Sequence, residues 1–243
     1  MASEPQGDAF PLTRHSVVSS AQSDDPQERA RALDAIAAAY WRPVYKYVRM
    51  RWRVDREDAQ DFTQDFFTRL LENEVLDSYD PEKGRLRTFL RTCADRLFMN
   101  QERDAHRLKR GSGAFHVSLN VDEAEQELAA APSNDSPEDY FEKEWVRTLF
   151  ALAVERLRSL CNSEGKEVQF ELFERYDLGD SEARPSYAEL GACFGLAVTD
   201  VTNYLAFARR EFRRCVLNQL REMTGSEDEF RREALSLLGV DAK

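Results

Sequence analysis

The sequence has few of the residues from which metal centres and active sites are built. It holds three histidines and four cysteines in 243 residues. Neither the histidines (His15, His106, His116) nor the cysteines (Cys93, Cys161, Cys193, Cys215) cluster at metal-ligand spacing. No Ser-His-Asp set and no GxxxxGK[ST] or GxGxxG loop can be assembled either. We therefore expect no metal, no cofactor and no enzymatic activity, and buried reduced cysteines.

Long apolar runs are also missing. No stretch approaches the roughly 20 apolar residues of a membrane span, and the first residues lack the basic and then apolar order of a signal peptide. These absences predict a cytoplasmic protein without a membrane partner. Glycine and proline are scarce, at 10 and 8 residues, while a third of the residues are charged. That composition favours polar-faced helices.

Charge is present but unevenly distributed. The net charge of -11 argues against indiscriminate binding to nucleic acid, whose phosphates need Lys and Arg. The segment from Lys83 to Arg110, however, contains nine basic residues and three acids. The segment from Asp122 to Glu144 contains nine acids and one lysine. A basic helical block followed by an acidic linker is a polarised layout.

Apolar spacing divides the chain into an all-α protein of two helical domains. The predicted boundaries are a disordered tail at 1–27, a first domain at 28–112, a linker at 113–137, a second domain at 138–222 and an extension at 223–243 with a short helix. In the first domain, two helices are expected to meet near Trp41-Arg42-Pro43, because proline interrupts helices.

The second domain contains the pattern of a helix-turn-helix. Ser186 and Glu189 form a capping box, which predicts a helix from Tyr187 to Phe194 that stops at Gly195. A second helix is predicted from Val198 to about Gln219. Its outer face carries small polar residues followed by arginines, which suit base edges and phosphates, although an ordinary solvated face fits the same pattern.

A predicted third helix has an unusual acidic face. Asp58, Asp61 and Asp65 lie on one side, opposite Phe62 and Phe66. Like charges at this spacing repel one another, and a cationic partner would offset that cost. The alternative is a solvated face near a helix N-terminus, where the dipole favours acids.

Three blocks in order resemble the extracytoplasmic-function (ECF) type of sigma-70 family RNA polymerase sigma factor. Asp58-Ala59-Gln60-Asp61-Phe62-Thr63-Gln64-Asp65 resembles the core-polymerase-binding helix of that family. Gly84-Arg85-Leu86-Arg87-Thr88-Phe89-Leu90, with Asn100 and Arg103 after it, resembles the promoter-melting region. The helix-turn-helix resembles that of the second sigma domain.

The resemblance implies a transcription factor with two DNA-binding surfaces. Residues 28–112 would be sigma region 2, which binds core polymerase and the minus-ten element, and 138–222 sigma region 4, which binds the minus-thirty-five element. The clamp of the largest polymerase subunit would contact Asp58, Asp61, Gln64 and Asp65. Melted minus-ten DNA would contact Arg85, Arg87, Arg91, Arg96, Asn100 and Arg103, in line with single-strand binding. Duplex minus-thirty-five DNA would contact Thr199, Thr202, Asn203, Arg209, Arg210 and Arg213. The linker acids Asp122 to Glu127 would mimic nucleic acid in the RNA exit path.

The chain departs from the family at several positions and leaves its regulator open. Gln60 stands where an acid is expected, and Thr202 and either Tyr204 or Phe207 stand where basic residues are common. Some family members with a threonine in the third helix are controlled by a serine/threonine kinase, which makes Thr63 a candidate phosphorylation site; a packed threonine is the alternative. An anti-sigma protein is the other regulator that the resemblance suggests.

Two other functions are compatible with the same residues. A stand-alone helix-turn-helix regulator would bind duplex DNA without polymerase, and it leaves the acidic third helix unexplained. A helical scaffold that binds only proteins would not lose function when Arg85, Arg87 and Arg210 are neutralised.

Overall fold

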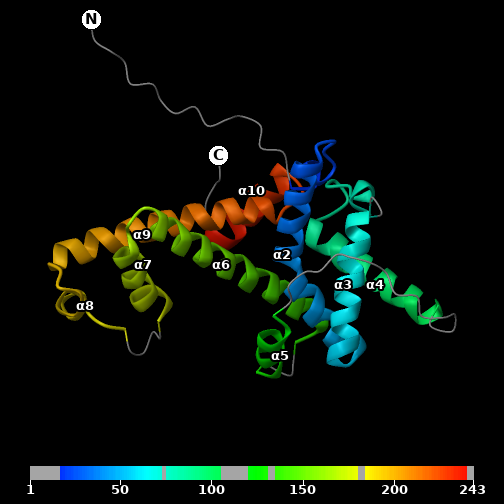
Figure 1. Ribbon diagram of the computed structural model, residues 1–243, viewed down its shortest axis with the longest axis horizontal. Coiled ribbons are helices and arrows are strands. Elements are labelled where there is room, and N and C mark those ends of the chain that lie inside the picture. Colours follow the sequence, from blue (N-terminus) through cyan, green and yellow to red (C-terminus); the bar gives the residue numbers. More distant parts are fainter. Residues whose placement is uncertain (1–16, 73–74, 105–119, 131–134, 180–183, 240–243) are drawn as a thin grey trace, which may run out of the picture.

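Figure 1 shows an all-helical molecule. The computed structural model describes residues 17–72, 75–104, 120–130, 135–179 and 184–239. Within these ranges every regular element is a helix, which confirms the predicted all-α class. The α-helices are α1 (Val17–Ala21), α2 (Pro26–Trp52), α3 (Arg56–Glu72), α4 (Leu86–Asp104), α5 (Val121–Ala129), α6 (Pro137–Ser163), α7 (Glu167–Phe173), α8 (Tyr187–Phe194), α9 (Val198–Glu222) and α10 (Glu227–Leu238).

The helix α2 corrects the prediction of two helices meeting at Pro43. It runs unbroken for 27 residues, from a start capped by Asp25 to a left-handed Arg53. Proline removes one backbone donor from a helix interior. Here Tyr40, Val44 and Tyr47 on both sides of Pro43 are fully or almost fully buried, so packing holds the helix continuous in spite of that loss.

The first group of helices packs around α2. Phe62, Phe66 and Phe67 of α3 are buried, and Leu86 and Leu90 of α4 are buried beside them. The predicted tail at 1–27 differs from the structure at its C-terminal end, because Val17 and Val18 of α1 are buried. Residues 1–16 of that tail lie outside the described residues.

The second group is built on the long helices α6 and α9, which pack against each other over much of their length (Figure 1). The N-terminal half of α6 also packs on α2, and α7 packs on α9. A 3-10 turn, η1 (Val75–Ser78), and a π-helical turn, η2 (Glu174–Leu178), complete the elements. No single helix among those described is long and apolar enough to cross a membrane, although α8 and α9 together pass by length and composition.

The sequence left open how the two predicted domains are arranged, and in this structure they are in contact. Their buried apolar side chains form one contiguous cluster that extends from Val17 to Ala234. The segment predicted as a linker contains α5, whose Val121 and Ala124 are buried. In this structure the two groups of helices therefore share a core.

Candidate functional site

The acidic surface predicted on α3 is exposed at its N-terminal end. Asp55 stands before the helix and accepts a hydrogen bond from the backbone N–H of Asp58 at 2.8 Å. Asp58 and Asp61 are exposed, while Ala59 and Phe62 between them are buried. The apolar spacing of the helix thus turns these two carboxylates toward solvent, as expected.

The C-terminal part of this surface is already occupied. Asp65 is half-buried and accepts hydrogen bonds from Arg69 Nε at 3.0 Å and from the side-chain amide of Gln101 on α4. Gln64 beside it is also half-buried. Of the four residues predicted to bind polymerase, Asp58 and Asp61 are therefore exposed, whereas Gln64 and Asp65 are partly covered.

Thr63, the candidate phosphorylation site, points into the core. Its side chain is fully buried, and its hydroxyl donates to the backbone carbonyl of Ala59 at 2.7 Å. A phosphate would have to displace the apolar side chains packed around it. This geometry favours the alternative, a packed threonine, and phosphorylation stays an untested hypothesis.

The residues predicted to bind minus-ten DNA divide between two environments. Arg96 and Asn100 on α4 are exposed. Arg85, Arg87 and Arg91 instead face α6 or α10, and Arg91 lies 5.9 Å from the ring of Phe141. The side chain of Arg103 lies outside the described residues. Arg96 and Asn100 are therefore open, Arg85 is exposed but paired, and Arg87 is covered.

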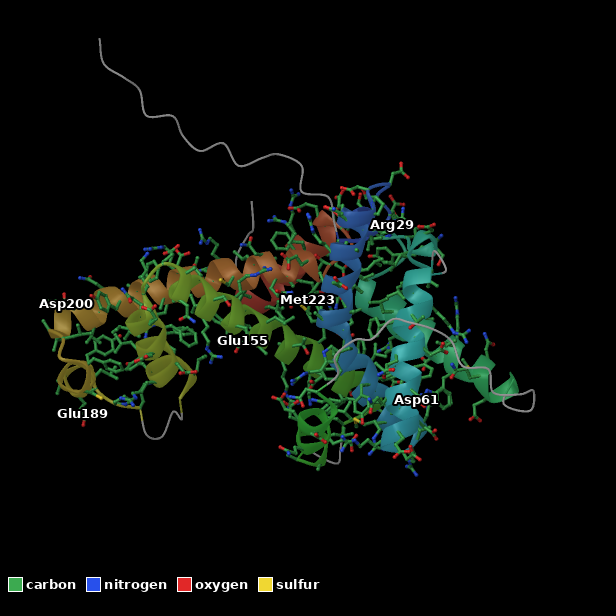
Figure 2. All side chains as sticks on the ribbon, viewed as in Figure 1. Arg29, Asp61, Glu155, Glu189, Asp200 and Met223 are labelled. Atoms are coloured by element: carbon green, nitrogen blue, oxygen red, sulfur yellow. The ribbon has the colours of Figure 1, made fainter. Side chains whose placement is uncertain are left out.

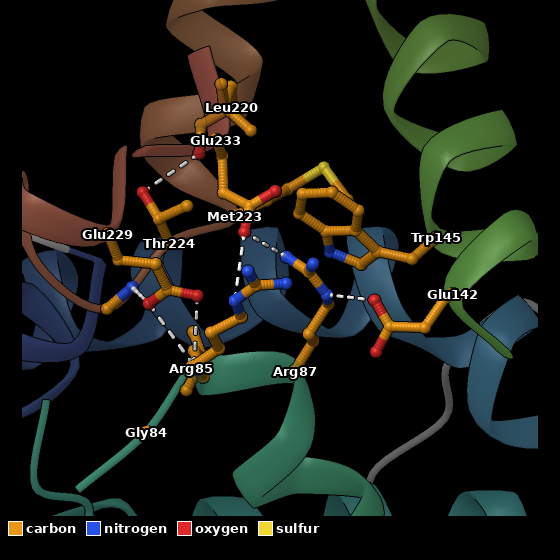
Figure 3. A network of polar contacts seen from close by, with 12 residues as sticks. Gly84, Arg85, Arg87, Glu142, Trp145, Leu220, Met223, Thr224, Glu229 and Glu233 are labelled. Carbon is orange, nitrogen blue, oxygen red and sulfur yellow. Dashed lines mark hydrogen bonds and ion pairs between the residues drawn. The ribbon is translucent and has the colours of Figure 1, made fainter. Parts of the chain in front are cut away.

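Arg87 is the centre of a buried charge network (Figure 3). Its guanidinium pairs with Glu142 of α6 at 2.5 Å and with Glu233 of α10 at 2.9 Å. It also lies 4.2 Å from the ring of Trp145. Arg85, which is half exposed, pairs with the same Glu233 oxygen at 3.2 Å. Two predicted DNA contacts are thus held by carboxylates of the same chain.

Glu229, one turn before Glu233, holds the start of α4. Its carboxylate accepts hydrogen bonds from the backbone N–H of Leu86 at 3.1 Å and of Gly225 at 2.9 Å, and Tyr79 lies 3.2 Å away. Burial raises the pKa of Glu229, although these hydrogen bonds and Arg87 oppose the rise. A buried carboxylate on α10 therefore ties the C-terminal extension to the first group of helices.

The acidic helix α5 lies against the basic side of α2. Glu125 accepts from Arg49 Nε at 2.7 Å and Nη2 at 2.8 Å, and from the hydroxyl of Tyr45 at 2.6 Å. The hydrogen bond from Arg49 holds the pKa of Glu125 below its usual value. Asp122 makes a single exposed ion pair with Arg56 of α3, at 2.6 Å. The acids predicted to mimic nucleic acid are thus paired with arginines of their own chain here.

The helix-turn-helix has the predicted bounds. Both hydrogen bonds of the Ser186–Glu189 capping box are present, and Gly195 ends α8 in the left-handed region at φ 68°. The axes of α8 and α9 differ by 99°, an angle typical of this motif. It lies at the opposite end of the molecule from Asp61 of α3 (Figure 2).

Most residues predicted to bind minus-thirty-five DNA lie on the open side of α9. All six, namely Thr199, Thr202, Asn203, Arg209, Arg210 and Arg213, are exposed. Arg209 is held more firmly, because its guanidinium pairs with Asp177 of η2 at 2.9 and 3.0 Å. Arg209 therefore joins α9 to η2 and is less available to DNA than its neighbours.

The acids that cover Arg85 and Arg87 were not among the predicted site residues. Glu229 and Glu233 share the helical spacing of the buried Phe230 and Ala234, so they lie on the inner side of α10. Acids on an apolar face are the signal that could have indicated a buried cationic partner. Nothing in the sequence identifies that partner, which is more than 140 residues away in the chain.

The cysteines differ in part from the expectation of buried thiols. Cys161 and Cys215 are buried, Cys93 is half-buried and Cys193 is exposed, and all four are free. Burial raises the pKa of the Cys215 thiol, which keeps it protonated and unreactive. In the described parts of the chain no group of three or more His, Cys, Asp or Glu side chains is arranged to hold a metal ion.

A comparison with known protein families finds a match within the first group of helices. Residues 36–108 match the family model of Sigma-70 region 2. The match begins within α2 and includes all of α3 and α4. It shows that this segment is similar to region 2 of sigma-70 family sigma factors. Neither the curated proteins nor the solved structures gave a match.

Proposed function

We propose that this chain is a sigma factor of the ECF type, which binds core RNA polymerase and directs initiation at specific promoters. The observation that carries the proposal is the match of residues 36–108 to Sigma-70 region 2, whose α3 presents exposed acids. Nucleotide chemistry would remain with the polymerase. This chain would contribute binding contacts with the polymerase and with promoter DNA.

The surface for polymerase would centre on Asp58 and Asp61. Both carboxylates are exposed on one end of α3, and a cationic surface on the polymerase clamp would relieve their mutual repulsion. Asp65 and Gln64 would extend this surface once polymerase offers better partners than Arg69 and Gln101. The clamp of the largest subunit is the partner that the family resemblance supplies.

Promoter DNA would meet two separate surfaces. Arg85, Arg87, Arg91, Arg96, Asn100 and Arg103 would hold the melted minus-ten strand, and the outer face of α9 would bind the minus-thirty-five duplex. Exposed Thr199, Thr202 and Asn203 near the start of α9 suit base edges, and Arg210 and Arg213 suit phosphates. The 99° angle between α8 and α9 supports the second assignment.

The test is in vitro transcription of a bacterial genomic library by core polymerase, with and without this protein. We expect discrete new start sites, and we expect the Asp58→Arg/Asp61→Arg variant to reduce them by about tenfold or more, because like charges at an interface cost several kcal/mol. Asp34→Arg, which reverses one carboxylate charge at an exposed position of α2, is the control and should retain the starts.

Two outcomes would contradict the proposed function, and a third would contradict the assignment of the polymerase surface. Absence of new starts together with retention of duplex DNA by the protein alone would favour a stand-alone helix-turn-helix regulator. If neither new starts nor retention of DNA is observed, the result would favour a scaffold that binds proteins. Equal activity of the Asp58→Arg/Asp61→Arg variant and the control would remove α3 as the polymerase surface.

A further inference from the structure

We infer that α10 and the start of α6 form an internal clamp that competes with nucleic acid for Arg85 and Arg87. The inference rests on the proposed function, since it concerns the same arginines. In the closed molecule, the carboxylates of Glu142 and Glu233 take the place that phosphates of melted DNA would take. Binding of DNA and closure of the clamp exclude each other.

The exclusion follows from burial. Arg87 is 4% exposed and Glu233 is 3% exposed, so no phosphate reaches the guanidinium while α10 is in place. Arg85 shares the same Glu233 oxygen. Arg96 and Asn100, farther along α4, remain exposed in the closed molecule. DNA would therefore reach Arg96, Asn100 and the exposed side of Arg85 before it could reach Arg87, which is covered.

Two further contacts, neither of which involves an arginine, hold α10 and the segment before it against the first group of helices. The Glu229 carboxylate accepts from the backbone N–H of Leu86, next to both arginines in the chain. Gly225, before α10, lies so close to Tyr79 that a Cβ at this position would stand 2.4 Å from its ring. The absence of a side chain at Gly225 is thus a condition for the closed arrangement.

The chemistry of the clamp suits an exchange of partners. A buried ion pair gains little net free energy, because the attraction is offset by the desolvation of both charges. Leaving Arg87 buried without an anion would be costly, whereas replacing one anion by another keeps its charge satisfied. Phosphates can therefore take over from Glu142 and Glu233 at a small net cost.

The test uses two variants of the full chain that open the clamp by different means. Glu233→Gln removes the shared anion, and Gly225→Ala forces Tyr79 and α10 apart. Asp228→Asn is the matched control, because it removes one charge from the exposed side of the same helix. Two quantities are measured: hydrogen exchange of the Leu86 amide, and binding of a fluorescein-labelled oligothymidylate by anisotropy.

We expect faster exchange at Leu86 in both opening variants and tighter binding of the oligothymidylate by about fivefold, because affinity rises with the fraction of competent molecules. The control should match the wild type in both. Adding Arg87→Gln to Glu233→Gln should abolish the gain. Circular dichroism, with helicity equal to that of the wild type, establishes that the variants are folded.

Three results would overturn the inference that α10 and the start of α6 keep DNA from these arginines. They are unchanged exchange at Leu86 in both variants, faster exchange without tighter binding, and a gain in binding that survives Arg87→Gln. None of these depends on polymerase. Failure of the clamp is therefore distinguishable from failure of the proposed function, which the transcription assay reports.

Discussion

Lys46 shows how single side chains are constrained in this molecule. It is fully buried on α2, and its ammonium pairs with Glu144 of α6 at 2.6 Å and with Glu127 of α5. Glu144 is buried as well. A buried charge is tolerated only with its partners present, so this lysine depends on two helices from outside its own group.

Replacement of this lysine tests that dependence. Lys46→Met should lower the free energy of unfolding by about 3 kcal/mol, because the buried Glu144 loses its main partner. The measurement is denaturant unfolding at neutral pH. Lys46→Met/Glu144→Gln should recover part of the loss. A double variant as unstable as the single one would contradict this account.

At the scale of one element, α5 is held by polar contacts more than by its small apolar side. Glu125 binds Arg49 through both carboxylate oxygens, while Asp122 and its partner Arg56 are both exposed. Paired planar groups are stronger than single exposed ion pairs. Glu125 thus contributes more than Asp122 to the position of α5, together with Glu127, which pairs with the buried Lys46.

The lowered pKa of Glu125 makes its contribution dependent on pH. Since the folded pKa lies below the ordinary value of 4.5, the stabilisation is complete above that value and is lost as the pH falls through the folded pKa. Glu125→Gln should therefore lower the free energy of unfolding by about 1 kcal/mol at pH 7 and by much less near pH 3.

Denaturant unfolding at both pH values measures this difference. Asp122→Asn, at an exposed pair on the same helix, is the control and should have little effect at either pH. A loss from Glu125→Gln that is equal at the two pH values would contradict the assignment.

The individual elements could be predicted where the signals are local. The capping box at Ser186 and the glycine at 195 fix both ends of α8, and both are determined within a few residues. The prediction of a break at Pro43 was wrong, because long-range packing of α2 outweighed the local tendency of proline to interrupt a helix. α5 was missed because its helix is short and its acids resemble those of a linker.

On the scale of the whole molecule, Tyr40 joins three helices. Its hydroxyl accepts from the indole N–H of Trp145 on α6 at 3.1 Å and donates to the carbonyl of Met223, at the end of α9, at 2.6 Å. Met223 lies beside α2 near the middle of the molecule (Figure 2). Both groups of helices therefore meet at one buried hydroxyl.

Removal of this hydroxyl should weaken both groups together. Tyr40→Phe should lower the free energy of unfolding by about 2 kcal/mol, since two buried polar groups lose their partner. Thermal unfolding followed by circular dichroism should show one transition in the wild type and one, shifted downward, in the variant. Two transitions, of which only one moves, would show that the groups unfold separately.

The contact between the two groups could not be predicted from the sequence. Each of its members has a local interpretation: Arg87 fits a DNA contact, Glu142 belongs to an acidic stretch, and Glu233 lies in the short helix predicted for the extension. Only the packing of α6 and α10 on α2 and α4 brings them together (Figure 3). Such pairings depend on the tertiary fold, which local spacing does not determine.

The position of Trp145 gives the molecule an intrinsic optical reporter. Its indole is fully buried, stacks near the Arg87 guanidinium and donates its N–H to Tyr40. The emission of an indole depends on nearby charge and on contact with water. Once the other two tryptophans, Trp41 and Trp52, are replaced by phenylalanine, fluorescence of Trp145 therefore reports whether the two groups of helices are in contact, without a label attached to the protein.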